Sequence, residues 1–228
     1  MFHYFDPMYY MFMLPPIALM LLAQFLVKSR YSKYGAIVNA KGMTGADAAR
    51  EILHANGIFD VNVVPIEGKL TDNYDPRTKI VSLSEGVYNG NSISAIGIAA
   101  HEVGHAIQHN TGYAPIKARN AIFPVSSLGS SIGPLVIIAG IIFNFPFLSY
   151  IGLIFFAFAV LFQLITLPVE FDASRRALNA IGTSGFLTTE EAEGAKKVLT
   201  AAALTYIAAL LQSLMMLIYY FLRSSRRN

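Results

Sequence analysis

Three ionisable residues within five positions, His101, Glu102 and His105, form an H-E-x-x-H pattern. On a helix, residues i and i+4 lie one turn apart on the same face, so the two imidazoles can reach one metal ion. Because the chain has no cysteine, a transition-metal site must be built from His, Asp and Glu, and imidazole nitrogen suits zinc. Glu102 is placed to take a proton from a zinc-acidified water and to pass it to the leaving amine. The pattern therefore predicts a catalytic site for peptide hydrolysis with one Zn²⁺ per chain.

The same pattern can occur by chance on a helix with two structural histidines, but the surrounding sequence argues against that interpretation. The preceding residues 96–100 are Ile-Gly-Ile-Ala-Ala, which predict an apolar and therefore buried helix. Burying three ionisable groups without a ligand is costly. Gly104 leaves room for another element to pack close to the metal.

A catalytic zinc ion has three protein ligands and an open position. His109 lies one further turn along the helix, and a straight helix carries it too far from the ion. We therefore interpret His109 as structural or as a support for the ligands. Glu170 is the better candidate for the third ligand, because Pro168 is expected to begin a new helix with Glu170 in its first turn.

Three residues that follow Glu170 are candidates to support the site. Ser174 lies one turn further on the same face of the expected helix, whereas Asp172 points away from Glu170. Arg175 is expected to anchor the edge of the membrane or to pair with the site or the substrate. Glu170 and Asp172 also have a simpler interpretation, as carboxylates that a helix N-terminus favours.

The composition indicates that lipid surrounds part of the chain. Hydrophobic residues make up 54% and charged residues 14%, against roughly 25% charged residues in an average soluble domain. The residues Asn144-Phe145-Pro146 predict a tight turn that joins two apolar segments into a hairpin. We expect an α-helical membrane protein with about four transmembrane helices. The predicted spans are residues 8–27, 125–143, 147–167 and 198–222.

The polar stretch after the first span, residues 28–121, has the composition of a small soluble domain, and we expect it to be a catalytic subdomain of the α+β class. Thr44 is suited to be a helix N-cap, and Asp75-Pro76-Arg77 is a turn sequence. The expected elements are a helix over residues 46–55, strands near residues 61–64, 70–74 and 79–83, and the H-E-x-x-H helix over residues 92–109.

A second polar stretch, residues 168–197, would bring the third zinc ligand, and residues 223–228 form a basic tail. Basic residues near the two polar stretches outnumber those of the tail, so the positive-inside rule predicts that both stretches face the cytoplasm. With four spans the arginines of the tail would then lie outside, which the rule disfavours. The formal net charge of +3 is too weak to indicate nucleic acid binding.

An N-terminal span is followed by Leu70-Thr-Asp-Asn-Tyr-Asp-Pro-Arg-Thr78, His101-Glu-Val-Gly-His-Ala-Ile-Gln-His109 and Leu167-Pro-Val-Glu-Phe-Asp-Ala-Ser-Arg-Arg-Ala177. In these segments and their order the chain resembles the YugP-type family of membrane neutral zinc metallopeptidases. It is similar in style to the gluzincin membrane peptidases of the heat-shock and CAAX-prenyl kind. The resemblance implies a gluzincin-like domain in a bacterial cell membrane, with Glu170 as the third ligand.

Many gluzincins have an Asp four residues after the ligand Glu, where it orients a zinc-bound His. This chain has Ser174 at that position, and Asp172 is the alternative. The resemblance also implies that a strand ahead of the active-site helix pairs with an extended substrate. The candidate segment, residues 73–83, includes Tyr74, Lys79 and Val81.

Peptide hydrolysis also needs a donor for the developing oxyanion. The sequence offers Tyr74, Tyr88, His109 and Arg175 and does not rank them.

The predicted activity is that of a zinc-dependent endopeptidase that cuts membrane or membrane-proximal proteins, with a role in protein quality control. The expected partners are the lipid bilayer, protein or peptide substrates, and membrane partner proteins or further copies of the chain, but not nucleic acid. One alternative is a non-catalytic metal-binding scaffold, against which the intact Glu102 argues. Another is cleavage within the membrane, which is disfavoured because residues 101–105 lie in a polar stretch ahead of the second span.

Overall fold

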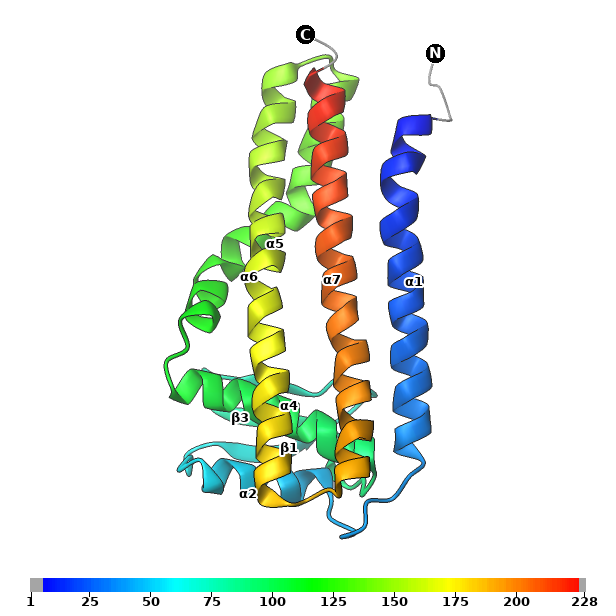
Figure 1. Cartoon of the computed structure of the whole chain (residues 1–228). Coiled ribbons are helices and arrows are strands. Elements are labelled where there is room, and N and C mark those ends of the chain that lie inside the picture. Colours follow the sequence, from blue (N-terminus) through cyan, green and yellow to red (C-terminus); the bar gives the residue numbers. More distant parts are fainter. Residues whose placement is uncertain (1–5, 226–228) are drawn as a thin grey trace. The chain divides into compact units, whose positions relative to one another are not determined.

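The computed structural model describes residues 6–225 (Figure 1). These residues form two units. The first unit contains residues 6–23, Lys117–Leu167 and residues 204–225. The second contains Gln24–Ile116 and Pro168–Ala203. The predicted polar stretches 28–121 and 168–197 are far apart in the sequence, but both fall largely in the second unit. Of the predicted basic tail, residues 226–228 lie outside the described residues.

Within residues 6–225, four long helices confirm the expected number of apolar segments, since each is long and apolar enough to cross a membrane. All four are longer than the predicted spans of 8–27, 125–143, 147–167 and 198–222. Their bounds are α1 (Pro7–Gly35), α5 (Ala114–Ile142), α6 (Pro146–Ser184) and α7 (Thr189–Ser225).

The expectation that Pro168 begins a new helix is wrong. Helix α6 runs without interruption from Pro146 to Ser184, with Pro168 inside it. A proline inside a helix removes one backbone hydrogen bond, and long apolar helices tolerate that loss where their neighbours compensate. Glu170 therefore lies in the middle of a 39-residue helix and not in a first turn.

In the first unit, α5 and α6 form the predicted hairpin. Asn144 has a φ of 51° in the connecting turn, and the Phe145 amide donates to the Gly140 carbonyl at 2.8 Å. The two helices approach closely, because a Cβ atom at Gly129 would stand 2.1 Å from the Phe155 carbonyl oxygen. The predicted turn at residues 144–146 is thus confirmed.

The beginning of α1 and the end of α7 are joined in the same unit by polar contacts. The Asp6 carboxylate accepts a hydrogen bond from the Tyr219 hydroxyl at 2.9 Å and pairs with Arg223 Nη1 at 2.7 Å. The Tyr9 ring lies edge-on to the Tyr219 ring at a centroid distance of 5.3 Å. Aromatic and charged residues of this kind are typical of the ends of membrane spans.

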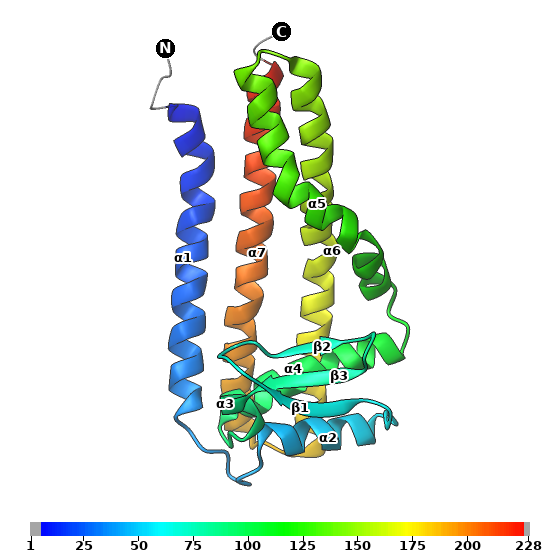
Figure 2. The same ribbon diagram turned by 180° about the vertical axis from the view of Figure 1, so that it is seen from behind.

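The second unit contains a three-stranded sheet beside short helices (Figure 2). Strand β3 lies in the centre, parallel to β1 and antiparallel to β2. The elements are α2 (Gly45–Ala55), β1 (Asn62–Ile66), β2 (Asn73–Asp75), β3 (Ile80–Ser84), α3 (Glu85–Tyr88) and α4 (Ile93–Asn110).

Most of the local predictions for this unit are confirmed. The Thr44 hydroxyl accepts from the Asp47 amide at the start of α2, as expected of an N-cap. The Asp75 carboxylate accepts from the Arg77 amide at 2.9 Å in the predicted turn. Strand β2 begins at Asn73 and not near residue 70, because Leu70 has a φ of 55°, in the left-handed region that an extended strand does not use.

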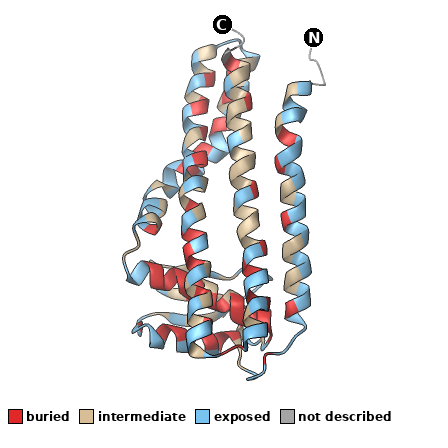
Figure 3. Ribbon diagram, viewed as in Figure 1, coloured by how far each residue is buried: buried red, intermediate tan, exposed pale blue. Residues whose placement is uncertain are grey.

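Helix α4 forms the centre of the hydrophobic core of the second unit, and most of its residues are buried (Figure 3). Its apolar residues pack with those of α2, β3 and the C-terminal half of α6. The core includes Ile52, Val81, Ile96, Val103 and Ile181. The predicted burial of the H-E-x-x-H helix is therefore confirmed.

Candidate metal centre

The helix that carries the H-E-x-x-H pattern has clear start and stop signals. The Ser92 hydroxyl caps the N-terminus of α4 by accepting from the Ala95 amide at 3.2 Å. Gly112, with a φ of 66°, follows the C-terminus. Between these ends, His101 and His105 lie one turn apart, and their rings meet edge to face with centroids 4.8 Å apart.

Glu170 of α6 completes a group of three candidate metal ligands with these histidines. Its Oε2 atom lies 3.3 Å from His101 Nε2 and 3.6 Å from His105 Nε2. One ligand atom from each of the three residues lies within 4.8 Å of the others. The exposed fractions of the side chains are 15% for His101, 11% for His105 and 3% for Glu170.

The donor set fits a zinc ion. Glu170 Oε2 is buried and has no hydrogen-bond partner, so its lone pairs are available. Zinc bonds of about 2.0–2.1 Å in a tetrahedron place neighbouring ligand atoms about 3.3–3.4 Å apart, close to the distances of 3.3 and 3.6 Å from Glu170 Oε2 to the two histidines. Two imidazoles and a carboxylate, with no cysteine in the chain, are a ligand set known from catalytic zinc sites.

Metal binding and protonation compete at this group. Burial opposes a charged imidazolium at His105, but contact with the Glu170 carboxylate and the charge of Glu102 outweigh it and raise the pKa of His105. A metal ion that binds here must therefore displace a proton.

Glu102 lies on α4 between the two histidines and is buried, with an exposed fraction of 9%. Burial raises the pKa of the Glu102 carboxyl, against the opposing influence of His101 and His105. A carboxyl whose pKa is moved toward neutrality can both accept and release a proton near pH 7.

Gly104 allows α4 and α6 to approach each other. A Cβ atom at this position would stand 2.5 Å from the Ala173 carbonyl oxygen and 3.2 Å from its Cα atom. The close approach holds Glu170, one turn before Ala173 on α6, against the two histidines. The predicted role of Gly104 as the place where another element packs is confirmed.

The nitrogen of each histidine that faces away from Glu170 has its own partner. The Ser174 hydroxyl lies 3.2 Å from His101 Nδ1. His105 Nδ1 lies 3.0 Å from Gln108 Oε1, and Gln108 Nε2 donates to Asp172 Oδ2 at 3.0 Å. Asp172 does point away from Glu170 along α6 and reaches His105 only through Gln108.

Sequence reasoning missed Gln108. A signal was available, because residues i and i+3 of a helix are neighbours and Gln108 follows His105 by three positions. Asp172 also pairs with Arg175 and Arg176. Arg175 is 71% exposed and contacts Asp172, so the structure does not bring it to the three candidate ligands.

His109 is not part of the three-residue group. Its Nδ1 atom lies 3.3 Å from the Tyr74 hydroxyl, which comes from β2. Tyr88, another candidate oxyanion donor, instead accepts from Arg50 at 2.6 Å. Of the four candidate donors, the structure brings Tyr74 and His109 together.

Val81 and Lys79, which were predicted to belong to a substrate-binding strand, lie in and directly before the central strand β3. Val81 lies in the central strand β3, where it is paired with Val63 on one side and with Tyr74 on the other. Lys79 precedes that strand with a φ of 54°, forms an ion pair with Asp60, and its carbonyl accepts from the Asn62 amide. A backbone with both edges occupied has no free groups for a further strand. Within residues 6–225, Tyr74 is the residue of this set on an edge strand.

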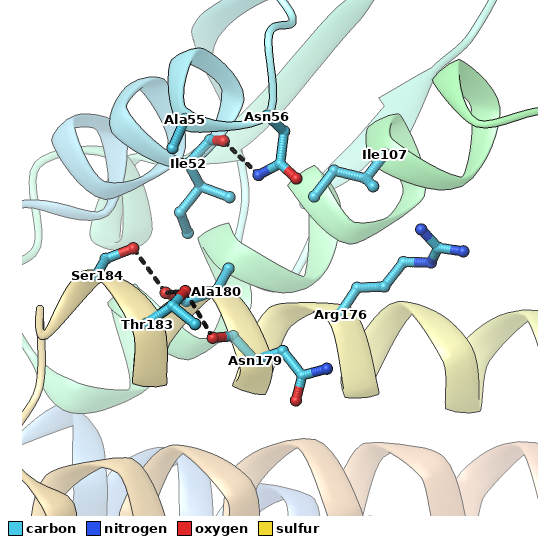
Figure 4. Close-up of a pocket in the computed structure, with 9 residues that line it drawn as sticks. All are labelled: Ile52, Ala55, Asn56, Ile107, Arg176, Asn179, Ala180, Thr183 and Ser184. Atoms are coloured by element: carbon cyan, nitrogen blue, oxygen red, sulfur yellow. Dashed lines mark hydrogen bonds between the residues drawn. The ribbon is translucent and has the colours of Figure 1, made fainter.

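A cleft of about 310 Å³ lies between α2, α4 and α6 (Figure 4). Its lining includes Asn56, Ile107, Arg176 and Asn179. Arg176 also pairs with Asp172 and lies over the Tyr113 ring at 5.6 Å. The cleft therefore adjoins the chain of contacts that leads through Asp172 and Gln108 to His105.

Comparisons with known proteins agree with the chemistry of these residues. The family described as "putative neutral zinc metallopeptidase" matches residues 9–225. The chain is 51% identical over 189 residues to "Putative membrane protease YugP" of Bacillus subtilis (strain 168), which covers 83% of this chain and 84% of that protein. No solved structure matches the chain significantly. The chain therefore belongs to the family described as "putative neutral zinc metallopeptidase".

Proposed function

We propose that the protein is a membrane-embedded zinc endopeptidase, with His101, His105 and Glu170 as ligands and Glu102 as the general base. One observation carries the proposal. Three side chains from α4 and α6 converge on one point, where the buried Glu170 Oε2 has no hydrogen-bond partner. Such a carboxylate is costly to bury unless a cation is bound beside it.

The chain's own residues provide the proton transfers. A bound zinc ion supplies a Lewis acid that polarises the scissile carbonyl and acidifies water. Glu102 accepts the proton of the attacking water and gives it to the leaving amine, for which its raised pKa is suited. The alternative function, a non-catalytic metal-binding scaffold, gives Glu102 no role, because a structural zinc site needs no general base.

The edge strand β2 is the proposed binding place for an extended substrate. Within the described residues, β2 pairs with β3 on one side. Its other edge can pair with a peptide backbone, which selects little by sequence. Tyr74 and His109, 3.3 Å apart, are then the proposed donors for the oxyanion.

Cleavage is proposed at the membrane surface and not within the bilayer. Helix α6 has 39 residues, a length of about 58 Å at 1.5 Å per residue, whereas the hydrocarbon core is about 30 Å thick. The apolar part of α6 ends near Leu167, and Glu170, Asp172, Arg175 and Arg176 follow. The ligand Glu170 thus comes directly after the part of the helix that suits lipid.

The remaining features of the proposal follow from the sequence and the family. We propose a gluzincin-like arrangement, a location in a bacterial cell membrane and an active site that faces the cytoplasm. The proposed substrates are membrane or membrane-proximal proteins in quality control. Partner membrane proteins or further copies of the chain would limit access to the site, and no nucleic acid is involved.

The test is a measurement of zinc content and casein cleavage on the full chain in detergent. We expect wild type to hold one zinc ion and to cleave, Glu102→Gln to keep zinc without cleaving, and Glu170→Ala to lose zinc. Glu51→Gln, at an exposed position of α2, is the matched control and should behave as wild type. Cleavage by Glu102→Gln at the wild-type rate, or full zinc in Glu170→Ala, would contradict the assigned role.

A further inference from the structure

Gln108 is a fully buried amide between the candidate metal centre and α6. Its exposed fraction is 0%. Its Oε1 atom lies 3.0 Å from His105 Nδ1, and its Nε2 atom donates to the Val169 carbonyl at 2.7 Å and to Asp172 Oδ2 at 3.0 Å. All the polar atoms of this side chain are therefore engaged, two of the contacts crossing from α4 to α6.

The partners of Gln108 decide which way its amide faces. A carbonyl oxygen and an ionised carboxylate can only accept hydrogen bonds, so the amide NH₂ must point at Val169 and Asp172. The amide oxygen then points at His105 Nδ1, which must carry a hydrogen to complete the contact. His105 is thereby held with its hydrogen at Nδ1 and with Nε2 directed toward Glu170.

Asp172 is itself held in place, so it is a hydrogen-bond acceptor of fixed position for the Gln108 amide. The carboxylate is 4% exposed and forms ion pairs with Arg175 and Arg176. Arg176 in turn lies over the Tyr113 ring. Hydrogen bonds with a charged acceptor are stronger than those between neutral groups, so the orientation of Gln108 is firmly set.

The partner of His101 does not fix its tautomer in the same way. Its Nδ1 partner is the Ser174 hydroxyl, which can rotate to donate or to accept. The two candidate zinc ligands of α4 are therefore held unequally, with His105 fixed in both ring orientation and tautomer.

We infer that Gln108 is a positioning residue that keeps His105 Nε2 directed at the zinc ion. Its hydrogen bond to the fixed Asp172 carboxylate orients the amide, and the amide oxygen orients His105. The inference rests on the proposed function, because it assigns a role in holding the same zinc ion. It extends that function by giving Gln108 and Asp172 a shared part in metal affinity. A hydrogen-bonded partner behind a metal-binding histidine typically contributes 10- to 100-fold to metal affinity.

The test compares zinc affinity in Gln108→Met and wild type, by competition with a chelator, and the visible spectrum of the cobalt-loaded protein. Methionine has a similar size, but its thioether is only a weak acceptor for His105 and cannot donate to Asp172. We expect the affinity to fall by about 10- to 100-fold and the cobalt spectrum to change. Ile96→Ala, a cavity in the same helix and core, is the matched control for destabilisation and should keep the wild-type affinity and spectrum.

The outcomes are distinguishable from failure of the proposed function. Two outcomes would overturn the inference, because each would show that Gln108 only stabilises the packing of α4 against α6. One is a wild-type zinc affinity in Gln108→Met. The other is an equal loss of zinc affinity in Ile96→Ala at a similar unfolding midpoint. Should Gln108→Met not fold, Asp172→Asn decides. Its zinc affinity is expected to fall by about tenfold relative to wild type, and an unchanged affinity would overturn the inference. A wild type that binds zinc without cleaving casein would instead count against the peptidase alone.

Discussion

Gly104 of α4 lies directly against the backbone of Ala173 in α6, so that a Cβ atom at residue 104 would stand 2.5 Å from the Ala173 carbonyl oxygen. Backbone atoms cannot move aside as a flexible side chain can. The distance between the two helices at the candidate metal centre is therefore set by the absence of a side chain at one position.

Replacing Gly104 with alanine is expected to push α4 and α6 apart. The strain should destabilise the protein by about 1–3 kcal/mol and weaken zinc binding, because Glu170 moves away from the histidines. Thermal unfolding in detergent and zinc titration would measure both effects. Gly182→Ala is the matched control, since that helical position of α6 has no atom within 4 Å of an added Cβ. It should be neutral or stabilising by up to about 1 kcal/mol, and unaltered zinc affinity in Gly104→Ala would contradict the interpretation.

The Ser174 hydroxyl supports His101 from the side opposite Glu170, at 3.2 Å from Nδ1. Ser174→Ala should lower zinc affinity by about tenfold, at the lower end of the range for such partners, because the hydroxyl is not fixed by a further charge. Chelator competition is the measurement. Ser184→Ala removes a hydroxyl on the same helix that donates only to the Ala180 carbonyl, and it should leave the affinity unchanged. A similar loss in both variants would mean that Ser174 acts on helix stability.

Tyr74 and His109 are expected to act on the reaction and not on the metal. Tyr74→Phe should lower kcat by about 10²-fold while zinc content stays at the wild-type level, as for the loss of one oxyanion donor. Steady-state casein or peptide cleavage with a parallel metal assay would measure this. The control is Tyr88→Phe, whose hydroxyl accepts from Arg50 at 2.6 Å and should not change kcat. Equal kcat in Tyr74→Phe and wild type would remove Tyr74 from the site.

The contact between Asp6 and Arg223 is expected to make stability depend on pH. Burial opposes ionisation of Asp6, but hydrogen bonds from Tyr219 and the backbone, together with the charge of Arg223, outweigh it and lower the pKa of Asp6. The folded pKa lies below the unfolded value of about 3.9, so the stabilisation is present above that value and is lost as the pH falls through the folded pKa.

Asp6→Asn should therefore lower the unfolding midpoint at neutral pH and flatten its dependence on pH below about 4. The pair is partly exposed, at 39% for Arg223 and 25% for Asp6, so the loss should stay under about 1 kcal/mol. Glu193→Gln breaks the more exposed pair with Lys196 and should have a smaller effect. A midpoint of Asp6→Asn equal to that of wild type at pH 7 would show that the ends of α1 and α7 do not depend on this contact.

Several local features could be predicted from the sequence, because they depend on neighbours along the chain. Composition and segment length indicated four apolar helices, and Asn144 with Pro146 indicated the turn between two of them. The H-E-x-x-H spacing placed His101 and His105 on one face of a helix, which is a property of helix geometry alone. The predicted ends of the helices were less accurate. Pro168 did not break α6, because packing offsets the single hydrogen bond that a proline removes.

What the sequence by itself determined was the identity of the candidate ligands and the local structure around the H-E-x-x-H pattern. Only the tertiary structure decided the contacts between residues far apart in the chain. It brought Glu170 to 3.3 Å from His101, linked His105 through Gln108 to Asp172, and placed Val81 in the centre of the sheet. The physical reason is that helical spacing fixes neighbours at i+3 and i+4, whereas the approach of α4 to α6 and the order of the strands depend on how whole faces pack.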